Sequence, residues 1–228
     1  MVSFSVDCRS GKEVLQIYYK FVLCSYLCLM FLILGCNTAN PQHSQPNQQQ
    51  QVQEESNDVT SLNWYLPSFQ AVDHNGKPFT ANDMKGKLWL VDLIFTRCNN
   101  VCPPMTANMA KIQQELKAQG VEIKIISFSV DPEYDTPQVL TQFAKKYHAD
   151  LSNWYFVTGY SFEEINKITE TAFKSNLTKS KGPTAEVPVM INHPSRFYLI
   201  DQNGKVRKFY DGLNPEPKEI ARDIQQLQ

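Results

Sequence analysis

Blocks of apolar and polar residues alternate along most of the chain in the pattern of an α/β domain. Residues 88–95 are almost continuously apolar, which is typical of a strand buried on both faces of a sheet, and residues 121–130 repeat this pattern. Between them, apolar residues follow the helical spacing over residues 105–116 and stop at Gly120. Strands that alternate with helices predict a mixed sheet covered by helices on both faces.

The same alternation continues toward the carboxyl end. Thr136 followed by Pro137 fits a helix N-cap and its first helical residue, so we expect a helix to about His148. Further patterns predict a strand at residues 154–157, a helix at residues 162–173 and a last helix from about residue 217. Asn-Gly pairs at residues 75–76 and 203–204 each predict a tight turn, so we expect one added hairpin near each end of the domain, with His74 exposed in the first turn.

The first 35 residues have the pattern of a targeting segment. Residues 21–35 are uncharged and follow Arg9, Lys12 and Lys20, and this run is short for a membrane span, which needs about 20 apolar residues. It ends in Leu-Ile-Leu-Gly before Cys36, which resembles the bacterial lipobox, in which the cysteine becomes lipidated after cleavage. We interpret residues 1–35 as a signal peptide and Cys36 as the lipidation site; an uncleaved anchor helix is the alternative. Both interpretations place the domain at the extracytoplasmic face of the bacterial cell membrane.

The next segment differs sharply in composition. Residues 36–58 are rich in Gln, Asn, Ser and Pro and contain almost no large apolar residue. Such a segment buries too little surface to offset its ordering entropy, so we expect a lipidated, disordered tether. Residues 59–228 are then left as one folded domain.

Charge and cysteine usage narrow the possible functions. The chain has 22 Lys and Arg against 23 Asp and Glu and has no basic block, so nothing indicates a nucleic-acid partner. Of its six cysteines, only Cys98 and Cys102 lie in the predicted domain. A disulfide scaffold is therefore excluded, and the pair is of interest for its chemistry.

The two domain cysteines lie where a predicted strand turns into a helix. Cysteines four residues apart at a helix start are about one turn apart, and the helix N-terminus favours thiolate over thiol. A thiolate is both the nucleophile of disulfide exchange and a soft ligand that Cu(I) prefers. The spacing alone therefore fits a redox pair and a metal pair equally well.

Two stretches resemble the Sco/SenC family: Phe95-Thr-Arg-Cys-Asn-Asn-Val-Cys-Pro-Pro-Met and Ser129-Val-Asp-Pro-Glu-Tyr-Asp-Thr-Pro. The resemblance extends roughly from Leu66 to the end of the chain and implies a thioredoxin-like fold. It also implies that Cys98, Cys102 and a distant histidine, His193, bind Cu(I) or Cu(II). The implied role is maturation of the dinuclear copper site of cytochrome c oxidase. Its implied partners are the copper-site subunit of the oxidase and other copper chaperones or thiol reductants. The surroundings of His193, Asn-His-Pro-Ser, depart from the more usual Asp-His-Ser of the family.

Asp92 and Asp131 are candidates for supporting roles, whereas we expect Asp135 and Met105 to be structural. Asp92 lies six positions before Cys98 on a buried strand, where thioredoxins resemble it in carrying an acid that manages protons; a core carboxylate is the alternative. Asp131 follows the end of a strand and is a candidate to face the metal or the partner protein. We expect Asp135 to be a turn or cap acid and Met105 to pack in the core.

Four functions remain open on this evidence. The first is a copper metallochaperone, and the second is an extracytoplasmic thiol-disulfide oxidoreductase that reduces the cysteines of the same copper site. A peroxidase of related fold is disfavoured because the Pro-x-x-x-Thr-x-x-Cys arrangement is absent around Thr96 and Arg97. The fourth is a surface lipoprotein without chemistry at Cys98 and Cys102.

Overall fold

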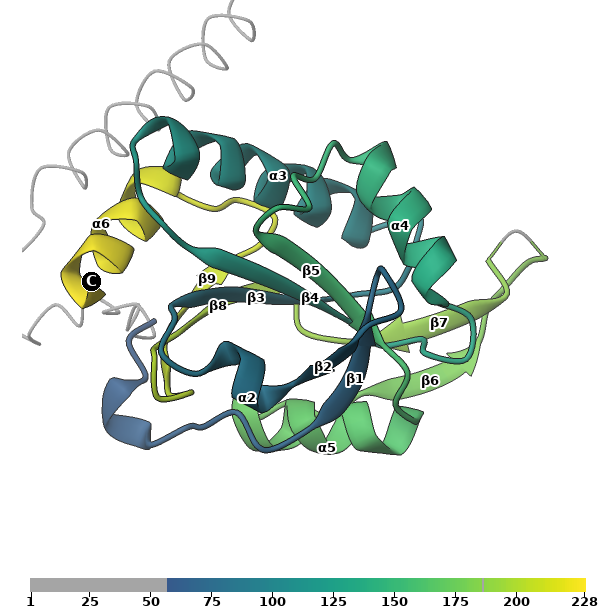
Figure 1. Ribbon diagram of the computed structural model, residues 1–228. Helices are drawn as coiled ribbons and strands as arrows, with labels where there is room; N and C mark the ends of the chain where they lie inside the picture. Colours follow the sequence, from purple (N-terminus) through teal and green to yellow (C-terminus); the bar gives the residue numbers. More distant parts are fainter. Residues whose placement is uncertain (1–56, 186) are drawn as a thin grey trace, which may run out of the picture. The chain divides into compact units, whose positions relative to one another are not determined.

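The computed structural model describes residues 57–185 and 187–228, which form a layered α/β domain (Figure 1). The predicted signal peptide, Cys36 and most of the predicted tether lie outside the described residues. Asn57 and Asp58, at the end of that tether, are part of the domain, because the Asn57 carbonyl accepts a hydrogen bond from Phe209 N at 3.0 Å and Asp58 bridges to Lys208. Among the residues described, no helix has the length and apolar character needed to cross a membrane.

The centre of the domain is a seven-stranded mixed sheet with the order β2-β1-β5-β4-β3-β8-β9. Its strands are β1 Gln70–Asp73, β2 Pro78–Thr80, β3 Trp89–Ile94, β4 Lys124–Ser129, β5 Trp154–Thr158, β8 Arg196–Ile200 and β9 Val206–Asp211. Strands β3, β4 and β5 are parallel to one another, whereas β8 is antiparallel to β3. The carboxyl ends of β3 and β4 and the amino end of β8 therefore meet at one edge of the sheet.

Helices cover both faces of this sheet, as the apolar pattern predicts (Figure 1). One apolar cluster lies between the sheet and α3 Cys102–Ala118, α4 Pro137–Lys146 and α6 Pro217–Leu227. The other lies between the sheet and α2 Ala81–Met84 and α5 Phe162–Phe173. The short helix η1 Thr60–Leu62 precedes these elements in the chain. The side chains of β3 and most of those of β4 are buried, because helices pack on both sides of them.

The local signals at helix ends and turns explain most element boundaries. Thr136 accepts a hydrogen bond from Val139 N at 3.3 Å and caps α4, and α5 and α6 begin at the residues that the sequence predicts. Hairpin β1–β2 turns at Asn75-Gly76 and hairpin β8–β9 at Asn203-Gly204, where both glycines have the positive φ that such turns require. The predicted N-terminal and C-terminal hairpins are therefore present.

Two features differ from the sequence predictions. His74 was predicted to be exposed but is buried, with 4% of its surface exposed, because its turn packs against β5 and α4. Its Nδ1 accepts a hydrogen bond from Phe156 N at 3.4 Å. The second difference is a separate two-stranded sheet of β6 Thr178–Lys181 and β7 Val189–Asn192, which we call the β6–β7 hairpin. No apolar run marks it, since all four residues of β6 are exposed.

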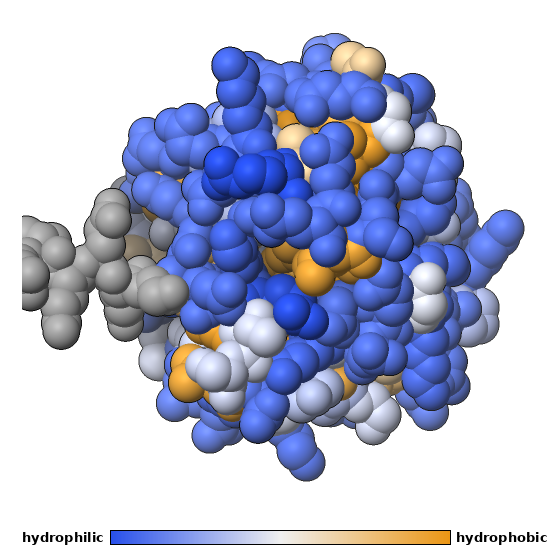
Figure 2. Space-filling model, turned by 90° about the vertical axis from the view of Figure 1, so that its left-hand side faces the viewer, coloured by the Kyte–Doolittle hydropathy of each residue, from blue (hydrophilic) through white to orange (hydrophobic). Residues whose placement is uncertain are grey.

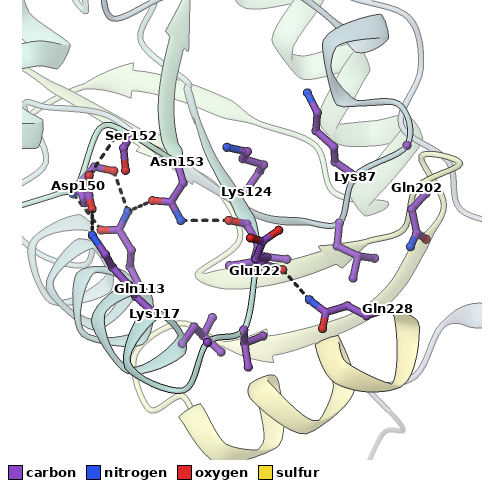
Figure 3. A pocket seen from close by; sticks show the side chains of 16 residues that line it. Lys87, Gln113, Lys117, Glu122, Lys124, Asp150, Ser152, Asn153, Gln202 and Gln228 are labelled. Atoms are coloured by element: carbon purple, nitrogen blue, oxygen red, sulfur yellow. Dashed lines mark hydrogen bonds and ion pairs between the residues drawn. The ribbon is translucent and has the colours of Figure 1, made fainter.

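An open cavity of about 800 Å³ lies at the opposite edge of the sheet from Cys98, near the starts of β3 and β4. Figure 3 shows that several of its polar side chains pair with one another: Lys117 Nζ lies 2.7 Å from Asp150, and Gln113 donates to Asn153. Figure 2, which views the side where α6 lies, shows mostly hydrophilic side chains with small apolar areas between them. Because the cavity lies at the opposite edge of the sheet, it is separate from the predicted site at Cys98 and Cys102.

Candidate metal centre

Three predicted ligands meet at the edge of the sheet where β3 ends and β8 begins. Cys98 lies in the loop after β3, Cys102 is the first residue of α3, and His193 lies between β7 and β8. The antiparallel pairing of β3 with β8 brings the loop that carries His193 beside the loop that carries Cys98. Residues 91 positions apart in the chain are thereby in contact, with His193 Nε2 3.5 Å from Cys102 Sγ.

The loop that carries Cys98 is held by a buried acid. The Asp135 carboxylate accepts hydrogen bonds from the backbone N–H and hydroxyl of Thr96, two residues before Cys98, and from the Ser129 hydroxyl at 2.6 Å. The prediction of Asp135 as a simple turn or cap acid was wrong, because its side chain is fully buried and joins the ends of β3 and β4. Burial raises the pKa of Asp135, and its hydrogen bonds oppose that shift.

Cys98 and Cys102 have opposite environments. Helix α3 begins at Cys102, so Cys98 lies just before the helix, and its sulfur accepts a hydrogen bond from Cys102 N at 3.3 Å. The hydrogen bond from the Cys102 thiol, aided by backbone N–H groups at the helix start, lowers the pKa of Cys98 to about 6. Burial raises the pKa of Cys102, whose side chain has no exposed surface. Both cysteines are free thiols, with Cys98 partly exposed.

The hydrogen bond of Nδ1 orients His193 so that its other ring nitrogen, Nε2, could bind a metal. Nδ1 lies 3.1 Å from the Pro194 carbonyl, which can only accept, so Nδ1 carries the proton and the lone pair is on Nε2. The ring packs edge-on against Phe95 at the end of β3, with ring centroids 5.9 Å apart. Burial lowers the pKa of His193, so the imidazole is neutral at neutral pH, the form that binds a metal.

The donor set of this centre fits a thiophilic ion that accepts few ligands. Two sulfurs and one imidazole nitrogen form a soft donor set. Such a set binds copper in preference to hard cations such as Mg²⁺ or Ca²⁺. Among residues 57–185 and 187–228, no group of three or more His, Cys, Asp or Glu side chains is arranged to hold a metal ion, so the three predicted ligands do not form a complete cluster in this structure. The centre thus has one close sulfur–nitrogen contact, between Cys102 and His193, with Cys98 beside it.

Asp92 is a buried acid without a partner. Neither carboxylate oxygen has a hydrogen bond of good geometry in the described part of the chain; the hydroxyl of Ser127, its register neighbour on β4, accepts from Trp154 Nε1 and only partly offsets the effect of burial on the pKa of Asp92. Burial raises the pKa of Asp92 to about 7. Its charge in turn adds to the rise in the pKa of Cys102, which indicates that the two groups are electrostatically coupled. Its proposed part in proton transfer remains a prediction.

Asp131 is held by cations and does not join the ligand set. Its carboxylate is fully buried and bonds to Arg97, with Nε at 2.9 Å from Oδ2, while Lys179 Nζ lies 3.3 Å from Oδ1. Arg97 adjoins Cys98 and its guanidinium stacks over Tyr134, 4.3 Å from the ring centroid. Arg97 was not among the predicted supporting residues, although its place beside Cys98 was a usable signal. Lys179 has no such signal in its surroundings.

Met105 is buried, as predicted.

Comparison with known proteins gives a consistent picture. The family model SCO1/SenC matches residues 57–228. The chain is similar to the structure of a SCO1/SenC family lipoprotein from Bacillus anthracis, with 45% identity, a TM-score of 0.65 and coverage of 73% of this chain and 96% of the other. BsSco, described with a disulfide switch as a member of the Sco family of cytochrome c oxidase assembly proteins, is 41% identical, with a TM-score of 0.64 and coverage of 73% and 94%.

A third similar structure contains copper. ScoI from Bradyrhizobium japonicum, solved with copper bound, is 25% identical, with a TM-score of 0.60 and coverage of 72% of this chain and 99% of that one. Together with the two closer structures, it confirms the predicted thioredoxin-like fold.

Proposed function

Because the chain belongs to the SCO1/SenC family, we propose that it is a copper metallochaperone for the dinuclear copper site of cytochrome c oxidase. Cys98, Cys102 and His193 bind the copper, which is cargo, and the copper-site subunit of the oxidase receives it. The observation that carries the proposal is the His193 lone pair 3.5 Å from the Cys102 sulfur, beside a cysteine of low pKa. The copper-bound ScoI and the oxidase-assembly role stated for BsSco support it.

The unequal cysteines suit a site that must both load and release its cargo. Cys98 is largely thiolate at neutral pH, since its pKa is about 6, and it makes the first contact with an incoming ion. Cys102 binds only after losing its proton, because burial raises its pKa. Metal affinity then includes the free energy of deprotonating Cys102, and reprotonation of that thiol favours release to the thiolates of a partner.

A second candidate function uses the same sulfurs without a metal. The Cys98 thiolate attacks a disulfide of the oxidase subunit, forms a mixed disulfide and releases one partner thiolate. Cys102 then loses its proton to the Asp92 carboxylate and attacks Cys98, which releases the second partner sulfur as a thiolate and leaves this protein with a Cys98–Cys102 disulfide. The electrostatic coupling of Asp92 to Cys102 and the disulfide switch described for BsSco favour this reading.

We further propose that Cys36 carries a lipid that holds the domain at the extracytoplasmic face of the membrane. The Leu-Ile-Leu-Gly-Cys sequence supports this attachment, as does the likeness to a Bacillus anthracis lipoprotein. Radiolabelled palmitate should enter the wild-type protein expressed in a bacterial host but not a Cys36→Ser variant. Absence of label from the wild type would favour the uncleaved anchor.

A copper titration tests the binding proposal. The reduced protein should bind one equivalent of Cu(II) and develop absorption in the thiolate-to-copper charge-transfer region. Cys98→Ser and Cys102→Ser should each abolish that band, and His193→Ala should weaken binding by about 10–100-fold, the loss typical even for supporting groups. His148→Asn, at an exposed residue with positive φ, is the matched control and should titrate as wild type does. A wild-type protein without the band would refute copper binding at this centre.

A further inference from the structure

The β6–β7 hairpin carries His193 directly after its last residue, Asn192. The hairpin pairs only with itself in the described part of the chain and is separate from the seven-stranded sheet. The position of the imidazole relative to the two cysteines therefore depends on what holds this hairpin. On β6, Lys179 is the register partner of Ile191, which lies two residues before His193.

The Lys179 side chain crosses from the hairpin to the end of β4. Its Nζ lies 2.6 Å from Glu133 Oε2, 3.3 Å from Asp131 Oδ1 and 5.7 Å from the centroid of the Phe162 ring. Lys179 belongs to an exposed strand, but only 26% of its side-chain surface is exposed, because the side chain lies against these groups. Lys179 is therefore an ordered contact between the hairpin and the loop after β4.

Asp131 extends the same contact to the cysteines. Its Oδ2 accepts hydrogen bonds from Arg97, the residue before Cys98, while its Oδ1 faces Lys179. One buried carboxylate is thus paired with a cationic side chain from each half of the centre. Arg97 comes from the loop of Cys98, and Lys179 comes from the hairpin that precedes His193.

We infer that Lys179 is a positioning residue for the metal centre: through Asp131 and Arg97 it fixes the hairpin that carries His193 against the loop that carries Cys98. The inference rests on the proposed copper site and adds to it a residue outside the ligand set. Lys179 touches neither copper nor a ligand, so its effect is on geometry alone.

The burial of Asp131 makes this contact stronger than an ordinary surface ion pair. Exposed pairs contribute little, and the Lys179–Glu133 pair belongs to that class because the Glu133 side chain is 74% exposed. Asp131 has no exposed side-chain surface, and its Oδ1 has no hydrogen-bond partner in the described residues, so the nearby Lys179 ammonium compensates its charge. Removing that ammonium leaves the buried Oδ1 without a facing cation and loosens the hairpin, which the buried side chains of Val189 and Ile191 still hold to the core.

The variants are Lys179→Met, which keeps the aliphatic length without the charge, and Lys179→Arg, which restores a cation. Lys181→Met is the matched control, since Lys181 lies two residues further along β6, is exposed and has no ion pair within the described ranges. Lys179→Gln replaces Lys179→Met if the latter does not fold by circular dichroism. Two measurements are made: copper affinity by chelator competition, and motion of the His193 ring in the metal-free protein by NMR relaxation.

Lys179→Met should lower copper affinity about tenfold, at the low end of the effect of supporting groups, and should increase motion of the His193 ring. Lys179→Arg should largely restore both, and Lys181→Met should match wild type. Equal ring motion in Lys179→Met and Lys181→Met would overturn the positioning role, whatever the copper result. A wild-type protein that binds no copper refutes the proposed function instead, and the relaxation comparison still decides the role of Lys179.

Discussion

At the scale of single residues, the two cysteines differ because one sulfur receives hydrogen bonds and the other is sealed from solvent. Cys98 accepts from Cys102 and from the start of α3, which stabilises its thiolate. Cys102 has no exposed surface and retains its proton. This asymmetry makes Cys98 the group that reacts first with either a metal ion or a disulfide.

The asymmetry predicts a selective alkylation profile. The pKa of Cys98 is lowered to about 6, so its thiolate fraction rises through that pH and is nearly complete at pH 7.5. Reduced protein treated with iodoacetamide should be modified once, at Cys98, with a rate that is half-maximal near pH 6 by mass spectrometry. Cys102→Ala removes the hydrogen bond from the Cys102 side chain and should shift the midpoint upward. A wild-type midpoint near 9, or first modification at Cys102, would contradict the described environments.

Asp92 gives a pH-dependent stability with a defined sign. Its pKa rises from 3.8 to about 7 on folding, so the folded state binds its proton more tightly than the unfolded state. Its stabilising contribution is complete below about pH 4 and is lost as pH increases to about 7, by up to about 4 kcal/mol. Urea unfolding of the reduced protein at pH 5 and pH 8 should show a decrease that Asp92→Asn lacks.

The same variant tests proton transfer. Asp92→Asn should slow thiol-disulfide exchange, since Cys102 loses its nearby base, without abolishing metal binding. Equal exchange rates of variant and wild type across neutral pH would leave Asp92 with a structural role only.

Some residues of the site could be predicted from the sequence, and others could not. Cys98, Cys102 and His193 stand in motifs or beside recognisable strands, and the structure brings them together. Lys179 has no local signal, because its contact with Asp131 depends on a hairpin that the apolar pattern does not reveal. Acids in loops look alike in sequence, which is why Asp135 resembled a turn residue.

At the scale of elements, the site depends on how the loops after β3 and β4 are joined. Asp135 accepts hydrogen bonds from Thr96 and Ser129, and so links the loop of Cys98 to the end of β4. Its acceptors are buried, so an unmatched donor there is costly.

Asp135→Asn should therefore lower the free energy of unfolding by about 1–3 kcal/mol, because an amide NH₂ would face the Thr96 donors. It should also raise the pH midpoint of Cys98 alkylation, since the loop loses its fixed position. Thr136→Ala, the adjacent control, removes only the N-cap of α4 and should cost about 1 kcal/mol with no change in alkylation. Identical alkylation profiles for all three proteins would show that Asp135 does not position Cys98.

The elements that the sequence predicts are those with strong periodic or capping signals. Strand β3, helices α3 to α6 and both Asn-Gly hairpins follow from apolar runs, caps and turn residues. The β6–β7 hairpin has an entirely exposed strand and a partner with only two buried residues, so its apolar pattern is too weak to detect. Tertiary contacts, including the one made by Lys179, hold it in place.

At the scale of the whole molecule, topology explains why two proposed ligands 91 positions apart in the chain, Cys102 and His193, lie in contact. Parallel β3 and β4 and antiparallel β8 all present their loops at one edge, while the open cavity lies at the other (Figures 1 and 3). Strand order could not be read from the sequence, because pairing between β3 and β8 is non-local. The resemblance to the family supplied that information instead.

We propose that the centre handles copper and is more than a dithiol. His193 decides it, because disulfide exchange needs only the two sulfurs, whereas the metal centre needs the imidazole as well. The most direct test complements a deletion strain with wild type, Cys98→Ala, His193→Ala and the control His148→Asn, and measures cytochrome c oxidase activity at limiting copper. We predict rescue by wild type and His148→Asn, and loss of activity with both Cys98→Ala and His193→Ala. Full rescue by His193→Ala, with none by Cys98→Ala, would contradict copper transfer and leave the thiol-disulfide oxidoreductase.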